Sequence, residues 1–134
     1  MSGLARKLMA AASGVEKLYV DDVFSTRIYT GNGSTQTVSS GIDLAGKGGL
    51  VWCKSRDNAG GGWPHALVDT ARGKNDFLSS NLADGNESCA GDISAFHGNG
   101  ITYNGPTATS NFNRNGTTYV NWFFRKAPQF FDIV

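Results

Sequence analysis

The fold class is indicated first by the stretch Thr118-Tyr119-Val120-Asn121-Trp122-Phe123-Phe124-Arg125. Its aromatic and β-branched residues are typical of strands, and an extended chain points successive side chains to opposite faces. Val120, Trp122 and Phe124 would share one face, while Tyr119, Asn121 and Phe123 share the other. The stretch therefore predicts a β-strand with two well-defined faces.

Two pairs of shorter segments outside this strand have the pattern of hairpins. Residues 93–97 and 101–103 flank Gly98-Asn99-Gly100, and residues 24–29 and 34–38 flank Gly31-Asn32-Gly33. Asn-Gly pairs favour the positive φ angles of tight turns, and the chain has such pairs at residues 32, 99, 104 and 115. The sequence therefore predicts two hairpins.

Three further segments complete the predicted set of about eight short strands. Residues 50–54 are short and apolar enough to predict a strand buried on both faces. Residues 65–69 and 77–78 predict two more strands, and the polar residues 79–92 a long connection. Many short strands separated by turn signals are typical of an all-β, antiparallel β-sandwich of the jelly-roll kind, here expected over residues 18–128.

Composition excludes several classes of protein. The 134 residues include 12 Lys and Arg against 11 Asp and Glu, so the formal net charge of +1 predicts no nucleic-acid groove. A hydrophobic content of 40% is enough for one core and one domain. No apolar run approaches the roughly 20 residues that span a bilayer, so we expect no membrane insertion.

Both ends of the chain are apolar and are candidate assembly contacts. Residues 3–12 predict one short N-terminal α-helix in which Leu4 and Leu8 lie on one side, within an anchoring arm at 1–17. This helix packs on the domain or on a neighbouring subunit, or the arm is frayed. After Pro128, residues 129–134 predict a C-terminal strand carrying Phe130, Phe131 and Ile133. That strand closes the sheet, pairs with another subunit, or leads into a further domain.

Residue types with catalytic or metal-binding potential are scattered along the chain. Cys53 and Cys89 lie far apart, with neither the spacing of a zinc site nor a flanking His, and are expected to be reduced and buried. The acidic turn at 84–87 is the best local cluster for calcium, but such turns are usually unliganded. We therefore expect no catalytic residues, no cofactor and no metal, and a protein that is not an enzyme.

Two smaller groups of residues are given specific roles. Asp69 and Arg72 are expected to form a salt-bridged structural turn in which Gly73 releases the backbone. Trp63 in a Gly-rich loop, together with Tyr103 and Asn111, is a candidate glycan contact, because aromatic rings stack on sugars and amides hydrogen-bond to them.

Five motifs in order carry a family resemblance. They are residues 48–56, 65–73, 78–81, 96–101 and 118–128. Together they resemble the repeating domain of tailed-bacteriophage structural proteins, especially tail-fibre, tailspike and related virion proteins. The resemblance implies a concanavalin-like or laminin-G-like sandwich used for display, adhesion or host attachment rather than catalysis.

The resemblance also implies partners and a location. The chain would be a virion structural protein, either the N-terminal virion-docking part of a tail fibre or tailspike or a related tail or decoration protein. It would be assembled in the host bacterial cytoplasm with other virion proteins, as a homo-oligomer for which a trimer is expected by analogy. The alternative function is a carbohydrate-binding module that recognises a host surface glycan.

Overall fold

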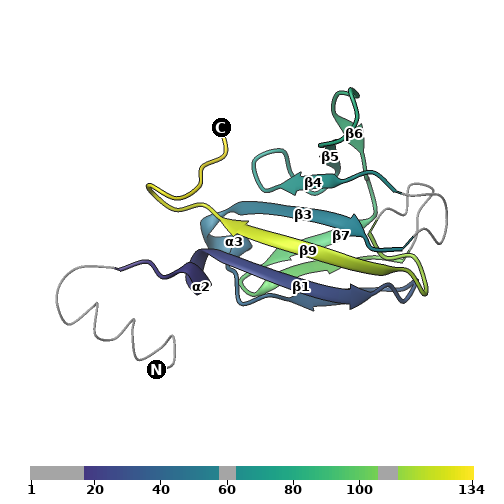
Figure 1. Ribbon diagram of the computed structural model, residues 1–134, viewed down its shortest axis with the longest axis horizontal. Helices are drawn as coiled ribbons and strands as arrows, with labels where there is room; N and C mark the ends of the chain where they lie inside the picture. Colours follow the sequence, from purple (N-terminus) through teal and green to yellow (C-terminus); the bar gives the residue numbers. More distant parts are fainter. Residues whose placement is uncertain (1–16, 58–62, 106–111) are drawn as a thin grey trace.

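The computed structural model describes residues 17–57, 63–105 and 112–134 (Figure 1). The predicted N-terminal helix, with Leu4 and Leu8, lies outside the described residues, as does Asn111. The elements in the described part are α2 (Val20–Val23), β1 (Phe24–Thr30), β2 (Gln36–Ser39), α3 (Leu44–Lys47), β3 (Gly49–Ser55), β4 (Ala66–Asp69), β5 (Asp76–Ser79), β6 (Glu87–Ser88), β7 (Ile93–His97), β8 (Gly100–Tyr103) and β9 (Thr118–Arg125).

The strands form two antiparallel sheets that lie one behind the other. The larger sheet has the order β1-β9-β3-β4-β5-β6, and the smaller has the order β2-β8-β7. In Figure 1 the larger sheet faces the viewer and β7 lies behind it. The prediction of an all-β fold built from antiparallel sheets is confirmed, and the arrangement is sandwich-like.

The core between the sheets is crossed by a row of four stacked aromatic rings. The row runs from Tyr119 to Tyr29, Tyr103 and Phe112, with ring centroids 5.1, 5.7 and 5.5 Å apart and interplanar angles of 16° or less. Tyr119 and Tyr29 come from the larger sheet and Tyr103 from the smaller one. Offset stacking adds to the hydrophobic gain of burying the rings, so the row ties the two sheets together.

The tyrosine hydroxyls inside this core are hydrogen-bonded, whereas Asn121 Oδ1 is buried with no partner among the described residues. The Tyr29 hydroxyl donates to the Phe112 carbonyl at 2.6 Å, and the Asn121 amide donates to the Tyr103 hydroxyl at 2.7 Å. Burial raises the pKa of both tyrosines well above 10.0 and that of the Cys53 thiol to about 12. Cys53 and Cys89 are both free and buried, as expected.

The hairpin predicted around residues 31–33 is wrong, whereas the one predicted around residues 98–100 is present. β1 pairs with β9 and β2 with β8, so residues 31–35 cross from one sheet to the other. The Gly31 amide donates to the Thr117 carbonyl at 2.8 Å, and the Gly33 amide donates to the Asn113 carbonyl at 3.0 Å. These long-range bonds replace the local pairing that an Asn-Gly turn would close. By contrast, β7 and β8 do form the hairpin predicted around residues 98–100.

Three other predictions of local structure need correction. β3 is buried on one face only, because its even-numbered residues are partly exposed. β6 lies inside the segment predicted as a connection at 79–92. Residues 129–134 form no strand: the chain turns at Gln129, where φ is 63°, and returns to pair Ala127 with Phe131 in a single bridge. The two four-residue helices were not predicted, because one turn has no periodicity to detect.

Candidate interaction surfaces

The outward face of the larger sheet carries rows of large apolar side chains. Strand register places residues that face each other across neighbouring strands on the same side of the sheet. The rows are Phe24–Phe124–Leu50–Asp69, Thr26–Trp122–Trp52–Leu67–Leu78 and Ile28–Val120–Lys54. We call these residues the outer face.

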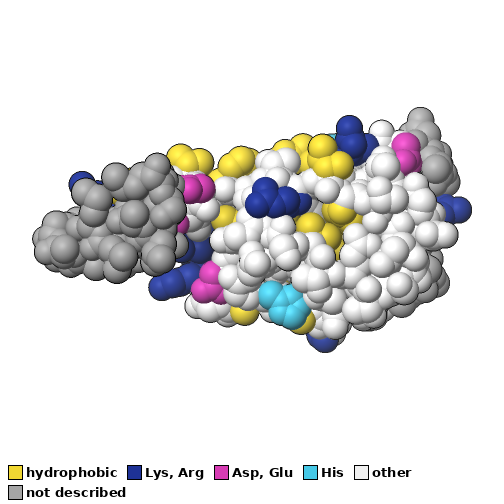
Figure 2. All heavy atoms as spheres, turned by 90° about the horizontal axis from the view of Figure 1, so that it is seen from below, with side chains coloured by type: hydrophobic (Ala, Val, Ile, Leu, Met, Phe, Trp, Pro, Cys, Tyr) yellow, Lys and Arg dark blue, Asp and Glu magenta, His cyan; other side chains and the backbone are white. Residues whose placement is uncertain are grey.

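The apolar residues of the outer face keep part of their surface exposed. Ile28 is 62% exposed, and those of β3, β4, β5 and β9 are half-buried. The three rows contain two charged residues, Lys54 and the buried Asp69. Figure 2 shows the molecule from below, so the face seen in Figure 1 lies along the upper rim. Hydrophobic side chains gather along this rim. Continuous apolar surfaces of this kind usually mark interaction sites.

At the centre of the outer face, Trp52 and Trp122 form a cluster with His65, which lies beside Trp52. Both Trp122 and His65 lie edge-on to Trp52, with ring centroids 5.5 Å away in each case. The Trp52 indole donates to His65 Nδ1 at 2.8 Å, so the neutral imidazole carries its own proton on Nε2. Desolvation, with a smaller contribution from Lys54, lowers the pKa of His65 below 6.5.

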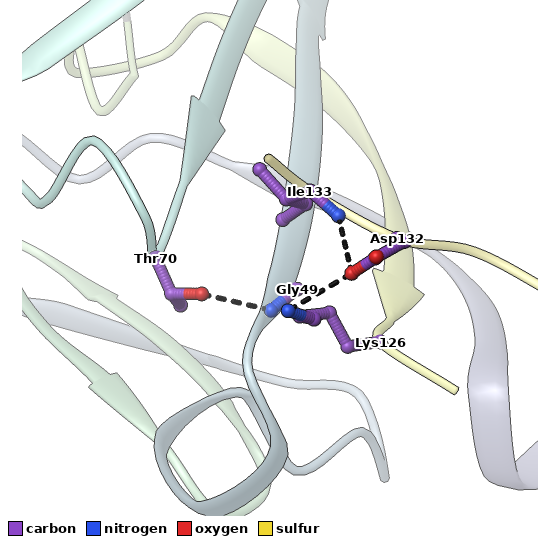
Figure 3. Close-up of polar contacts among 5 residues, drawn as sticks. All are labelled: Gly49, Thr70, Lys126, Asp132 and Ile133. Atoms are coloured by element: carbon purple, nitrogen blue, oxygen red, sulfur yellow. Dashed lines mark hydrogen bonds and ion pairs between the residues drawn. The ribbon is translucent and has the colours of Figure 1, made fainter. Parts of the chain in front are cut away.

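The C-terminal segment folds back and extends the outer face. The Phe131 ring contacts that of Phe124, with centroids 5.6 Å apart. Figure 3 shows the Asp132 carboxylate accepting from Lys126 Nζ and from the Ile133 amide, both at 2.9 Å. The hydrogen bond from Lys126 holds the pKa of Asp132 below its ordinary value. Of the predicted assembly contacts in this segment, Phe131 and Ile133 are half-buried and Phe130 is exposed.

A second surface, which we call the terminal groove, lies where the chain enters and leaves the larger sheet. Its volume is about 660 Å³, and its walls come from α2 with the residues before it, from α3, and from the end of β9 with the turn that follows. The lining residues are Leu18, Tyr19, Val20, Val23, Lys47, Arg125, Lys126, Ala127, Pro128, Gln129 and Phe130.

The Asp69 turn has the predicted contacts. Asp69 Oδ1 accepts from the Arg72 amide at 2.7 Å, and Asp69 Oδ2 lies 3.5 Å from Arg72 Nε. Gly73 has a φ of 95°, and its amide donates to the Asp69 carbonyl at 3.0 Å. Asp69 is buried, so its role here is to hold the turn between β4 and β5.

Of the three candidate glycan contacts, Trp63 and Tyr103 lie among the described residues. Tyr103 is fully buried in the aromatic row, so its assignment as a glycan contact is wrong. Trp63 is half-buried, and its indole Nε1 is buried with no hydrogen-bond partner in the described part of the chain. The prediction failed for Tyr103 because a strand residue next to a turn looks the same in sequence whether it points inward or outward.

Sequence reasoning also missed the outer face as a site. The alternation of β9 correctly separates Val120, Trp122 and Phe124 from Tyr119, Asn121 and Phe123. Both sets are aromatic, however, so nothing local marks which set is buried. The available signal was the surplus of large apolar residues at even positions of both β3 and β9.

Among residues 17–57, 63–105 and 112–134, no three His, Cys, Asp or Glu side chains cluster as metal ligands would. None of the helices in these same ranges has the length and apolar character needed to cross a membrane.

The fold and these surfaces define a class: a small, sandwich-like β-domain whose larger sheet has a partly exposed apolar face. Residues 20–129 match the family described as a domain of unknown function, DUF7483, and the chain belongs to that family. No curated protein and no solved structure matches the chain.

Proposed function

We propose that this chain is a structural domain of a tailed-bacteriophage virion that acts by assembly rather than catalysis. It would be the virion-docking part of a tail fibre or tailspike, or a related tail or decoration protein, with a jelly-roll sandwich like those of concanavalin and laminin-G domains. It would be located in the virion as a homo-oligomer, with a trimer expected by analogy.

The observation that carries the proposal is the apolar outer face. Leaving Trp52, Trp122 and Ile28 partly in water is unfavourable for an isolated domain, and another protein surface that covers them removes that cost. Four of the five motifs that resemble phage virion proteins contribute to this face, through Leu50, Leu67, Leu78 and Phe124, among others. The resemblance and the apolar face therefore overlap in β3, β4, β5 and β9, whereas the β1 residues of the face lie outside the five motifs.

The first experiment tests association through the outer face. We expect the purified chain to self-associate as its concentration rises, measured by light scattering after size exclusion. Ile28→Glu places a charge on the face at an exposed position and should weaken this association. Leu82→Glu changes an exposed leucine outside the face and serves as the matched control. Assembly through this face would be contradicted if the wild type stays monomeric at all concentrations. It would also be contradicted if Ile28→Glu and Leu82→Glu self-associate to the same extent.

The second experiment tests the virion itself. The protein should be found by mass spectrometry in purified tailed particles from the source of the gene, and immunogold labelling should place it on the tail or capsid. Particles that lack the protein would exclude a virion role while leaving the self-association result intact.

A second candidate function is glycan binding at the cluster of Trp52, Trp122 and His65. The specific observation is a group of partly exposed aromatic rings beside two hydrogen-bond donors, His65 Nε2 and Lys54 Nζ, which is the chemistry that binds sugars. A glycan array with wild type and Trp52→Phe tests it, and Trp63→Phe tests the loop tryptophan predicted from sequence. Absence of binding by the wild type would exclude this function.

A further inference from the structure

The terminal groove combines apolar walls with positive charge. Its side chains include three of the most exposed large apolar residues in the described part, namely Val20 at 71%, Phe130 at 46% and Leu18 at 39%. Its charged lining residues are Lys47, Arg125 and Lys126, and no lining residue is a carboxylate. The residues that line the groove are therefore cationic, while Asp21 and Asp22 of α2 lie nearby in the chain but outside the lining.

Two of these cations have no ion-pair partner among residues 17–57, 63–105 and 112–134. Lys126 is paired with Asp132 at 2.9 Å. Lys47 and Arg125 form no ion pair with residues of the described part, and Arg125 Nε is buried there without a hydrogen-bond acceptor. A cation without an anionic neighbour gains a charge-assisted hydrogen bond when a carboxylate is brought to it, so an acidic group entering the groove would be bound favourably.

The chain's own N-terminal arm does not match this chemistry. Residues 1–16 carry Arg6 and Lys7 against the single acid Glu16, so the segment has the same sign of charge as the groove. Like charges brought together cost free energy, whereas a carboxylate placed near Arg125 gains a charge-assisted hydrogen bond.

We infer that the terminal groove binds a short, extended segment of a neighbouring polypeptide in which apolar and acidic residues alternate. The apolar residues cover Val20, Leu18 and Phe130, and a carboxylate bonds to Arg125 with support from Lys47. The inference rests on the proposed function, since it gives the chemistry of one partner in the assembly. The groove thus provides a second docking site, separate from the outer face.

The test is a binding experiment with the full chain and a defined probe. The probe is a fluorescein-labelled hexapeptide of alternating valine and glutamate, and the control peptide replaces glutamate with glutamine. Fluorescence anisotropy should show binding of the acidic peptide that weakens as salt is raised, and about tenfold weaker binding of the control. Equal binding of the two peptides would overturn the inference.

Charge variants assign the binding to the groove. Lys47→Gln and Arg125→Gln should each weaken binding of the acidic peptide about five- to tenfold. Arg56→Gln removes an exposed cation next to the opposite end of β9, where the Arg56 amide donates to the Thr118 carbonyl, and should change binding less than about twofold. Lys47 is exposed, so its variant keeps the test informative if Arg125→Gln fails to fold. Unchanged binding by Lys47→Gln and by a folded Arg125→Gln would refute the site.

Two further measurements separate the alternatives. A synthetic peptide of residues 1–16 should not displace the acidic probe, and displacement would make the chain's own arm the occupant instead. The Ile28→Glu variant should still bind the probe although its self-association is weakened. If the wild type self-associates but does not bind the probe, only the groove inference is excluded. If the wild type binds the probe but stays monomeric, only assembly through the outer face is excluded.

Discussion

At the residue scale, Asp69 makes two contacts with Arg72 whose contributions to stability can be compared. One is a hydrogen bond from the Arg72 backbone amide, and the other is an ion pair with the Arg72 side chain. The Asp69 carboxylate is buried and accepts from the Arg72 amide at 2.7 Å, whereas its 3.5 Å ion pair involves a side chain that is 29% exposed. We expect Asp69→Ala to lower the free energy of unfolding by about 1–2 kcal/mol, and Arg72→Ala by less than about 0.5 kcal/mol. Urea denaturation measures both, and equal losses would show that the ion pair dominates.

His65 provides a residue-scale prediction of pH dependence. Its pKa in the folded protein lies below the ordinary 6.5, so the unfolded chain takes up a proton first as pH falls. The stability contributed by neutral His65 is complete above pH 6.5 and decreases as pH falls through the folded-state pKa. Protonation also removes the acceptor for the Trp52 indole.

The measurement is the urea midpoint and the tryptophan fluorescence as pH is lowered from neutrality. We expect both to change with a single acid transition in the wild type, and His65→Gln to remove that transition. His97→Gln, which alters the histidine at the end of β7, should retain it. Identical pH profiles for wild type and His65→Gln would show that another group is responsible.

At the element scale, the start of β3 depends on close packing that only glycine permits. Gly49 lies between the end of β9 and the Thr70 turn, where its amide donates to Thr70 Oγ1 at 3.0 Å (Figure 3). A Cβ at this position would meet the Phe124 carbonyl and the Leu44 side chain. Gly49→Ala should therefore lower the free energy of unfolding by about 2–3 kcal/mol.

Gly85→Ala is the matched control for this prediction. Gly85 has open space at its Cβ position and no positive φ, so alanine should leave stability unchanged or raise it by up to about 1 kcal/mol. Chemical denaturation compares the two variants. A Gly49→Ala variant as stable as Gly85→Ala would mean that β3 and β9 can shift apart without cost.

The exposed edge of the larger sheet is held by one side chain of β1. Arg27 donates to the carbonyls of Ser39 and Ser40 at the end of β2, at 3.0 and 3.1 Å, and to the Thr26 carbonyl at 2.9 Å. These bonds link the two sheets and occupy part of an edge that would otherwise be open to another strand. Arg27→Leu should lower the free energy of unfolding by about 1–3 kcal/mol, whereas Arg56→Leu, measured in the same way, should have little effect.

At the scale of the whole molecule, the aromatic row determines whether the two sheets hold together. Phe112 stacks on Tyr103 of the smaller sheet and contacts Phe77 of the larger one at right angles, with centroids 6.0 Å apart. Phe112→Ala should leave a cavity between the sheets and cost about 3–5 kcal/mol. Phe130→Ala, at an exposed position, should cost less than about 0.5 kcal/mol. Calorimetry of both variants checks this, and similar melting temperatures would contradict it.

The sequence by itself determined the local structure of most strands. Alternation in residues 118–125 defined the two faces of β9, and Gly98-Asn99-Gly100 defined the β7–β8 hairpin, because side-chain period and turn chemistry act between residues that are close in the chain. It also determined the Asp69 turn, whose partners are three residues apart.

Only the tertiary structure decided which strands pair and which faces are buried. β1 pairs with β9 rather than with β2, through bonds between residues more than 80 positions apart. Tyr119 and Trp122 belong to equally apolar faces of one strand, yet Tyr119 is in the core and Trp122 on the outer face. A face becomes buried only when a second sheet covers it, and the position of that sheet depends on long-range packing, which the local pattern of residues does not contain.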